Sequence, residues 1–208
     1  KNPTEITELT EYAKDPIEGL KTLVEAADFT NTDWNETAIK AKAAEVLAEK
    51  TGAKVISVSV SDSTATITLR YGYSEATATI YTPSAVAAQW TAYIESTKLG
   101  STIVPGSDMK YSEVPQIKDA MYKGYSDIWA AKTEEDAAKA LEDSKAALLN
   151  AVKDYVKFLA DTVYNKGEAT VIGDKSYTVS EDDYSKAVTA INEATNVAGV
   201  LSAYDTML

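Results

Sequence analysis

Residues 54–81 alternate apolar and polar side chains along three consecutive runs, with Ser or Thr at most of the polar positions. The runs cover 54–60, 64–71 and 76–81, and short polar turns separate them. A period of two bounded by turn residues predicts a three-stranded antiparallel meander with one face toward solvent. The apolar positions expected to face the core are Ile56, Val58, Val60, Ala65, Ile67, Leu69, Tyr71, Ala76, Ala78 and Ile80.

On both sides of these strands, apolar residues recur every three or four positions, which predicts amphipathic helices. Helices are expected over 6–13, 17–27 and 35–51 before the strands, and over 82–100 after them. Residues 99–113 show no period and are interrupted by Gly and Pro, which is typical of a linker. We therefore expect two domains, covering residues 1–104 and 105–208.

The second half of the chain is mostly helical. One helix is expected from Pro115 through Ile128, and a longer one of roughly 50 Å from Thr133 to Asn165. A hairpin over 168–179 and a last helix that pauses at 194–196 complete it. The seam of the long helix is predicted at Ala137, Leu141, Ser144, Leu148, Ala151, Tyr155, Leu159 and Thr162. The predicted fold is α+β and predominantly α, an elongated helical bundle with a three-stranded antiparallel β-meander.

The amino-acid composition limits the kinds of catalytic and metal-binding site that the chain can form. The chain has 208 residues, with 32 acidic and 20 basic side chains, a formal charge of −12, and no His or Cys. Zinc sites built on His or Cys, thiolate nucleophiles, Ser–His–Asp triads and disulfides are therefore excluded. The single arginine, Arg70, leaves no Arg cluster to bind phosphate. We expect a protein that is not an enzyme; a hydrolase that uses only two carboxylates stays open as a further alternative.

The acidic charge is spread along the chain, with 14 acids against 9 bases in residues 1–104 and 18 against 11 in residues 105–208. Nucleic acids and anionic membranes are bound through Lys and Arg, so neither is an expected partner. No apolar run approaches the ~20 residues of a membrane span, so membrane insertion is not expected either.

Two acidic triplets, Glu134-Glu135-Asp136 and Glu181-Asp182-Asp183, offer the carboxylate oxygens that Ca²⁺ prefers. Neither has the alternating acidic spacing with a central Gly of an EF-hand loop. Both lie in the first turn of a predicted helix, where the helix dipole favours carboxylates. The favoured interpretation is a structural one, and a Ca²⁺ site is the alternative.

Thirteen Tyr and three Trp suggest a platform on which sugars could stack. Trp90 and Tyr93 lie on the apolar stripe of a predicted helix, where an aromatic side chain usually belongs to the core. Tyr73 and Tyr81 lie outside the inward alternation of the strands and are the candidate ligand-binding residues. Separately, Asn35-Glu36-Thr37 is an acceptor sequence for N-glycosylation.

Two passages, 127–138 and 190–200, share a pattern in which a helix ends in Ala, a Thr or Asn cap follows, and a new helix begins at once. This pattern resembles the helical-bundle modules repeated in prokaryotic S-layer proteins and other large cell-surface proteins, including FIVAR modules. The resemblance covers residues 115–208 and implies an extracellular structural or adhesive module, in proteins that often need Ca²⁺ to assemble. The S-layer-homology anchoring motif is not evident here, and the strands at 54–81 fall outside the pattern.

The leading functional expectation is a non-catalytic structural and assembly domain of an extracellular, S-layer-like cell-surface protein. Its expected partners are further copies of itself or other surface-protein domains, with cell-wall glycan as an additional partner. The alternative is an adhesin-like module that binds glycans or peptides through Tyr73, Tyr81 and the exposed face of the sheet.

Overall fold

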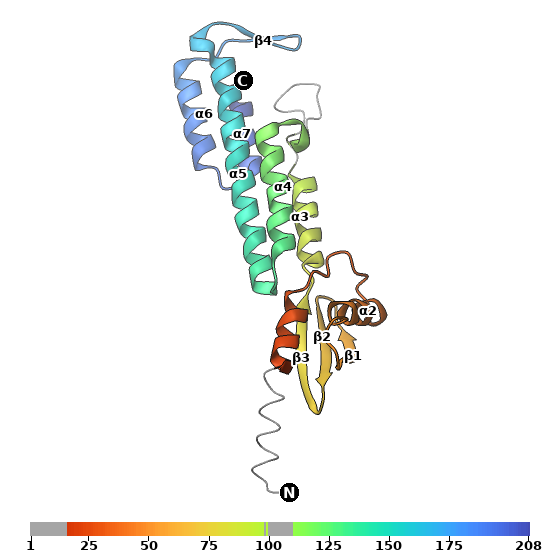
Figure 1. Ribbon diagram of the computed structural model, residues 1–208. Coiled ribbons are helices and arrows are strands. Elements are labelled where there is room, and N and C mark those ends of the chain that lie inside the picture. The colour runs from red at the N-terminus through yellow and green to blue at the C-terminus, as the bar shows by residue number, and fades with distance from the viewer. Residues whose placement is uncertain (1–15, 98, 100–109) are drawn as a thin grey trace, which may run out of the picture. The chain divides into compact units, whose positions relative to one another are not determined.

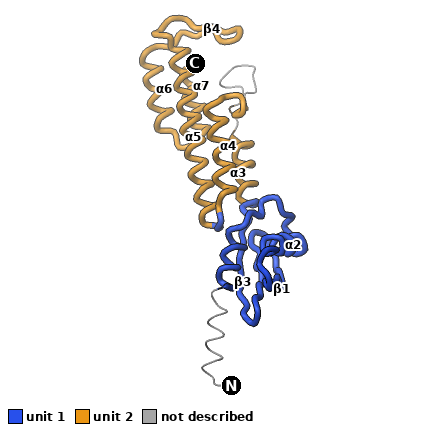
Figure 2. Tube along the Cα trace, in the orientation of Figure 1, with its two compact units in different colours: residues 1–85, 132–134 blue, residues 86–131, 135–208 orange. Residues whose placement is uncertain are grey.

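The computed structural model describes residues 16–97, 99 and 110–208 (Figure 1). Its fold is α+β and mainly α, as predicted. The chain forms two compact units, residues 1–85 with 132–134 and residues 86–131 with 135–208 (Figure 2). The helix expected over 6–13 and most of the expected linker lie outside the described residues.

Unit 1 contains the predicted meander. Its strands are β1 (Ala53–Val60), β2 (Thr64–Tyr71) and β3 (Ser74–Tyr81), paired antiparallel in the order β1-β2-β3. Two helices cover one face of this sheet, residues 16–26 and α2 (Glu36–Val46). The core between sheet and helices consists of Ile17, Leu20, Val24, Phe29, Ile39, Ala43, Leu47, Ala65, Ile67, Leu69, Ala78 and Ile80.

The inward positions of β2 and β3 were predicted correctly, but β1 departs from strict alternation. Its register shifts between Val55 and Ser57, so Ile56 is the extra residue of a β-bulge. Val55 packs against the core in the place predicted for Ile56. A bulge inserts one residue into a strand and reverses the faces beyond it, which a period of two cannot anticipate.

Both free edges of the sheet are met by side chains from the covering helices. The Thr79 N–H of β3 donates to Glu25 Oε1 at 3.0 Å. On β1, Lys40 Nζ donates to the carbonyl of the bulge residue Ile56 at 3.0 Å. Edges of a sheet that are covered by neighbouring elements are less available to other chains, and each contact occupies one free backbone group of an edge strand.

Helix α2 ends earlier than predicted, at Val46 instead of residue 51. The chain then turns through hydrogen bonds from Lys50 N to Leu47 O and from Ala53 N to Lys50 O. Gly52 has a φ of +90°, a conformation that glycine adopts readily, and it leads directly into β1.

Unit 2 is the helical part of the chain, with the predicted small hairpin after its longest helix. Its elements, in chain order, are α3 (Ser84–Ser96), the 3₁₀ turn η1 (Tyr111–Glu113), α4 (Pro115–Ala130), α5 (Glu134–Tyr164), the 3₁₀ turn η2 (Asn165–Gly167), β4 (Thr170–Ile172), β5 (Lys175–Tyr177), α6 (Glu181–Glu193) and α7 (Val197–Met207). With 31 residues, α5 is about 46 Å long.

The division between the units falls between residues 85 and 86, whereas the sequence analysis placed it after residue 104. Packing of α3 explains the difference. Trp90 is fully buried, and its Nε1 donates to the Met121 carbonyl of α4 at 3.2 Å. Its ring also lies against Gly124 of α4. This indole contact joins α3 to α4 within the second unit, and the position of Gly and Pro residues along the chain does not reveal it.

The buried seam of α5 follows the prediction only as far as Leu148. Beyond it the buried residues are Val152, Val156, Ala160 and Val163, where the prediction had Ala151, Tyr155, Leu159 and Thr162. A strict seven-residue repeat drifts by about 20° per heptad on a helix of 3.6 residues per turn. The predicted seam assumed alternating spacings of three and four residues, whereas the buried face of the helix follows 3.6 residues per turn.

The joints noted in the sequence at 127–138 and 190–200 have the same backbone geometry. Ala131 ends α4 with φ −63° and ψ 138°, and Ala194 ends α6 with φ −58° and ψ 135°. At the second joint, the Asn196 side chain caps α7 by accepting from Gly199 N.

Candidate functional site

The candidate site is the outer face of the three-stranded sheet, opposite the core. The register places its side chains in rows that cross all three strands, and two rows consist entirely of hydroxyl residues. We call these two rows the hydroxyl face: Ser59–Thr66–Thr79 and Ser57–Thr68–Thr77. Neighbouring strands lie about 4.8 Å apart, and rows two residues apart along a strand are separated by about 6.8 Å.

Local sequence explains why this face is polar and regular. Thr has a high β propensity because its branched side chain suits a pleated surface, and its hydroxyl both donates and accepts a hydrogen bond. Both helices of unit 1 pack on the opposite face, with the core. All six residues of the hydroxyl face except the half-buried Thr68 are exposed. The face therefore presents ordered hydrogen-bonding groups without a charge.

Charges of the outer face are confined to the next row, Lys54–Arg70–Glu75. Arg70 Nε donates to Glu75 Oε1 at 2.7 Å, and the same carboxylate oxygen contacts Arg70 Nη2. Both side chains are about half exposed, so this ion pair adds little to stability. It orders the end of the face next to the β2–β3 turn.

The two tyrosines nominated from sequence do not form one platform. Tyr73 precedes β3 at the β2–β3 turn with a relative exposure of 106%, and Tyr81 is the last residue of the same strand. The eight residues of β3 span roughly 25 Å, so the two rings lie at opposite ends of the face. Tyr81 is half-buried; burial and the nearby Glu134 carboxylate raise its pKa. Only Tyr73 presents a fully accessible ring.

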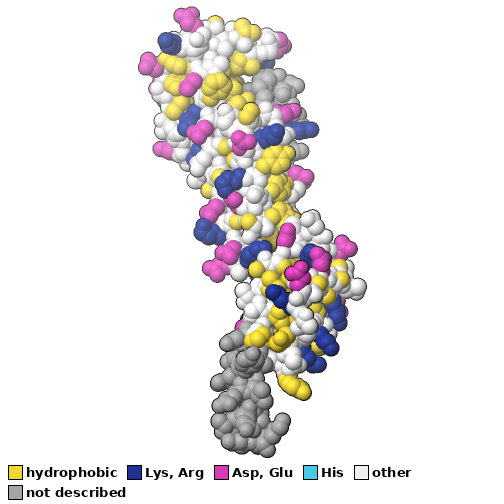
Figure 3. All heavy atoms as spheres, viewed as in Figure 1, with side chains coloured by type: hydrophobic (Ala, Val, Ile, Leu, Met, Phe, Trp, Pro, Cys, Tyr) yellow, Lys and Arg dark blue, Asp and Glu magenta, His cyan; other side chains and the backbone are white. Residues whose placement is uncertain are grey.

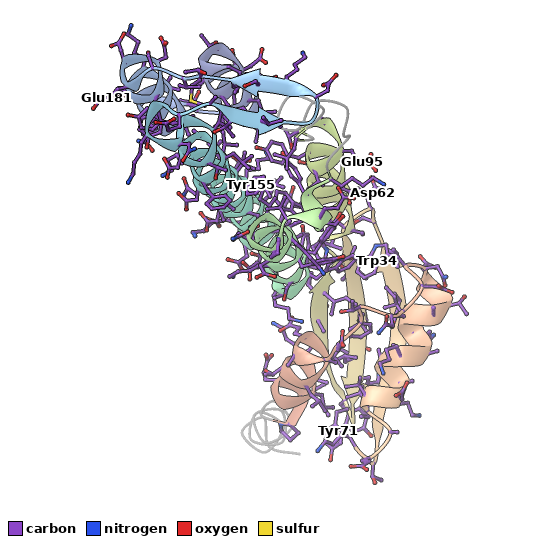
Figure 4. The ribbon with its side chains drawn as sticks, turned by 90° about the horizontal axis from the view of Figure 1, so that it is seen from above. Trp34, Asp62, Tyr71, Glu95, Tyr155 and Glu181 are labelled. Atoms are coloured by element: carbon purple, nitrogen blue, oxygen red, sulfur yellow. The ribbon has the colours of Figure 1, made fainter. Side chains whose placement is uncertain are left out.

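Three labelled residues mark the two ends of the three-stranded sheet. Trp34 and Asp62 lie near one end of the strands, while Tyr71 lies at the other (Figure 4). Trp34 Nε1 donates to the Ser61 carbonyl at 2.8 Å, which fixes the β1–β2 turn to the loop before α2.

The acidic triplets occupy the first turns of α5 and α6, as the structural interpretation predicted. Asp182 forms an ion pair with Lys186 at 2.6 Å, and Ser180 Oγ donates to Asp183 Oδ2 at 2.6 Å. Across residues 16–97, 99 and 110–208, no group of three or more acidic side chains is arranged to hold a metal ion. Neither Glu134-Glu135-Asp136 nor Glu181-Asp182-Asp183 forms such a group in the described residues.

Asn35 is the N-cap of α2. Its Oδ1 accepts from Ala38 N at 2.9 Å, and the residue is exposed. Charges of both signs are scattered over the visible surface (Figure 3).

Unit 2 contains an aromatic cluster that the sequence did not single out. The pKa of buried Tyr204 is raised to about 12, first by burial and then by the nearby Tyr177 and Tyr155. Tyr164 and Tyr184 stack with ring centroids 4.3 Å apart, and the Tyr184 hydroxyl donates to Asp161 at 2.5 Å. The stacked rings and the hydrogen bond to Asp161 join α5 to α6.

Comparison with known proteins gives no match for this chain among family models, curated proteins or solved structures. Within the part of the chain that the structure describes, no helix combines the length and apolar character needed to cross a membrane.

The residues that make up the hydroxyl face were each visible as outward positions in the strands. What the sequence did not supply was their alignment into rows, because the register of β1 depends on the bulge at Ile56. A pairing of Thr64-x-Thr66-x-Thr68 with Thr77-x-Thr79 is the signal that could have indicated them.

Proposed function

We propose that this chain is a non-catalytic structural and assembly domain of an extracellular cell-surface protein, similar to the modules of S-layer proteins. The observation that carries the proposal is the hydroxyl face, an exposed, uncharged and regularly spaced surface on a chain whose formal charge is −12.

Electrostatics favours this face for assembly. Copies of a strongly acidic protein repel one another over most of their surface. The hydroxyl face carries no charge in its two rows, so contact there avoids the repulsion and the desolvation of ions. Its hydroxyls can exchange hydrogen bonds with water for hydrogen bonds with a polar partner surface. A further domain of the same protein, or a second copy, meets that requirement.

The matching joints at Ala131 and Ala194 also support the proposal. Their φ and ψ angles agree within about 5°. A recurring helix–cap–helix joint is what the resemblance to cell-surface helical modules implies, and each joint redirects the chain without a long loop.

The test is the association state of the full chain. Sedimentation velocity over a range of concentrations, with Ca²⁺ and with a chelator, should show reversible association that Thr66→Lys weakens by placing a charge at the centre of the hydroxyl face. Ala147→Lys, at an exposed position of α5, is the matched control and should leave association unchanged. A chain that stays monomeric throughout, and that impermeant reagents fail to label on intact cells, contradicts the proposal.

A second candidate function, glycan binding, is favoured by one observation. The Tyr73 ring is fully exposed in the β2–β3 turn, which follows the Arg70–Glu75 row, and an exposed aromatic ring near hydrogen-bonding groups is suited to the apolar face of a sugar. Binding on a glycan array that Tyr73→Ala abolishes would support it. Tyr122→Ala, which removes a half-exposed Tyr of α4, is the control. A flat array for the unaltered protein removes this candidate.

A further inference from the structure

Asn35 uses only one of its two side-chain polar atoms to hold the fold. Oδ1 accepts the Ala38 N–H at 2.9 Å and so caps α2. Nδ2 makes no hydrogen bond with any residue that the structure describes. The residue is exposed, with extended backbone at φ −143° and ψ 160°. The cap therefore leaves the amide nitrogen open to solvent.

The loop that presents Asn35 is held in place on both sides. Before it, Trp34 Nε1 donates to the Ser61 carbonyl of the β1–β2 turn at 2.8 Å. After it, α2 begins at Glu36 and buries Ile39 in the core. Asn35 is thus displayed at a fixed position on the surface.

The chemistry around Asn35 matches an acceptor for sugar transfer. Thr37 follows two residues later and is also exposed. Asn35-Glu36-Thr37 is the only Asn-x-Ser/Thr triplet of the sequence whose middle residue is not Pro. Transferases of this class require the Asn amide together with the hydroxyl two residues on, on an accessible segment.

An open groove lies close to Asn35 along the chain, although Asn35 itself does not line it. Asp33 and Ala38, on either side of Asn35 along the chain, line an open groove of about 610 Å³. Five of its other lining residues are polar, Asp28, Asn31, Thr32, Lys42 and Glu45, and the sixth is Ala41. Polar side chains in an open groove offer hydrogen-bonding groups to a sugar attached nearby, and Asn35 and Thr37 are both exposed.

We propose that Asn35 carries an N-linked glycan, attached through Nδ2 while Oδ1 continues to cap α2. In the transfer, Nδ2 forms a bond to the anomeric carbon of a lipid-phosphate-linked sugar donor. The bond from that carbon to the phosphate oxygen breaks, the lipid phosphate leaves with the electron pair, and one amide proton passes to a base. The proposal rests on the extracellular location in the proposed function, because such donors are used on exported chains.

Asn196 provides an internal reference. It caps α7 in the same manner, with extended backbone at φ −152° and ψ 165° and a 2.8 Å bond from Gly199 N. Ala198 stands where an acceptor sequence requires Ser or Thr. The two caps therefore have the same backbone geometry, and only the Asn35 cap has a hydroxyl residue two positions later.

Peptide mapping tests the proposal on the full chain isolated from its own cells. Trypsin releases residues 22–40, which contain Asn31 and Asn35, and fragmentation in the mass spectrometer locates any sugar. We expect added sugar mass on Asn35 in the unaltered chain and in Thr37→Ser. We expect none in Asn35→Asp, which keeps the capping oxygen, or in Thr37→Ala. Ala198→Thr should gain a sugar at Asn196.

A bare Asn35 in the unaltered chain overturns the proposal, most clearly when Asn196 of Ala198→Thr is modified in the same cells. Labelling of intact cells with an impermeant reagent tests the proposed function separately. A labelled chain with bare Asn35 refutes the glycan alone, and an unlabelled chain refutes the extracellular function.

Discussion

A Cβ atom built on Gly124 of α4 would lie 2.6 Å from Cζ2 of Trp90 in α3, so the indole packs directly on the bare helix backbone. Trp90 is fully buried, and its Nε1 is bonded to the Met121 carbonyl. The surrounding core and this hydrogen bond therefore prevent the Trp90 ring from moving away from α4. The close approach of α3 and α4 requires glycine at position 124.

Gly124→Ala should destabilise unit 2. The added methyl group forces the indole or the helices apart at about 1–3 kcal/mol, against a gain in helix propensity of about 1 kcal/mol. Urea unfolding followed by circular dichroism should show a lower midpoint. Gly19→Ala, in the helix of residues 16–26, is the control: among the described residues, no atom outside its own stretch of helix lies within 4 Å of the added Cβ, so it should raise stability by up to about 1 kcal/mol. Equal effects of the two substitutions would contradict the packing argument.

Removal of the Glu25 carboxylate should expose the free edge of β3. Glu25→Ala leaves the Thr79 N–H without its 3.0 Å acceptor, at a cost of about 0.5–1.5 kcal/mol. Hydrogen exchange of the Thr79 amide should become faster. Glu25→Gln retains an acceptor oxygen and should exchange nearly as slowly as the unaltered protein. If both variants accelerate exchange equally, the side-chain contact does not protect the edge.

The cap of α2 should depend on an acceptor oxygen at position 35 and on nothing else in that side chain. Asn35→Ala is expected to lower the free energy of unfolding by about 1 kcal/mol, because the Ala38 N–H loses its partner. Asn35→Asp should be nearly neutral, since its carboxylate accepts the same bond and suits the positive end of the helix dipole. The measurement is denaturant unfolding of unglycosylated protein. A loss of stability in Asn35→Asp equal to that in Asn35→Ala would exclude a capping role.

Stability should fall at high pH because of Tyr204. Burial raises its folded-state pKa to about 12, from 10.0 for an unhindered Tyr. The folded state thus holds the proton more tightly than the unfolded state. The stabilisation is fully present below pH 10 and is lost as the pH rises toward 12, by roughly 2–3 kcal/mol from this residue.

Thermal unfolding across that pH range measures the effect, with phenolate absorbance as the direct readout of ionisation. Tyr204→Phe removes the titrating group, so its melting temperature should fall less steeply above pH 10. Tyr73→Phe, at a fully exposed position, is the control. Identical pH profiles for the Tyr204→Phe and unaltered proteins would disprove the assignment.

Much of the local structure followed from periodicity. The strands, the long helix α5, the hairpin and the pause before α7 are each encoded within a short stretch of chain, since alternation and helical spacing are properties of neighbouring residues. The predicted inward positions were wrong where the spacing of buried residues along a strand or helix changed by one residue. The bulge at Ile56 moves one inward position to Val55 while Val58 and Val60 stay inward as predicted, and beyond Leu148 each buried position of α5 is shifted by one residue.

The candidate site was predicted only in part. Asn35 was nominated from its triplet, and Tyr73 from its place outside the alternation, because both signals are local; both residues are exposed, and the functions assigned to them stay predictions. Tyr81 shared that signal but is half-buried next to Glu134, a residue far away in sequence. The burial of Tyr81 depends on packing against a distant part of the chain, which the alternation within a strand does not predict.

By itself, the sequence determined the absence of His- and Cys-based chemistry, the class of the fold, and the inward positions of β2 and β3. These follow from residue types and from spacing along one segment. Tertiary structure alone decided that Trp90 joins α3 to α4, that the free edges of the sheet are met by Glu25 and Lys40, and that hydroxyls from three strands align in rows. Each of these relations joins residues distant in the chain, and only the simultaneous packing of all elements fixes such pairs.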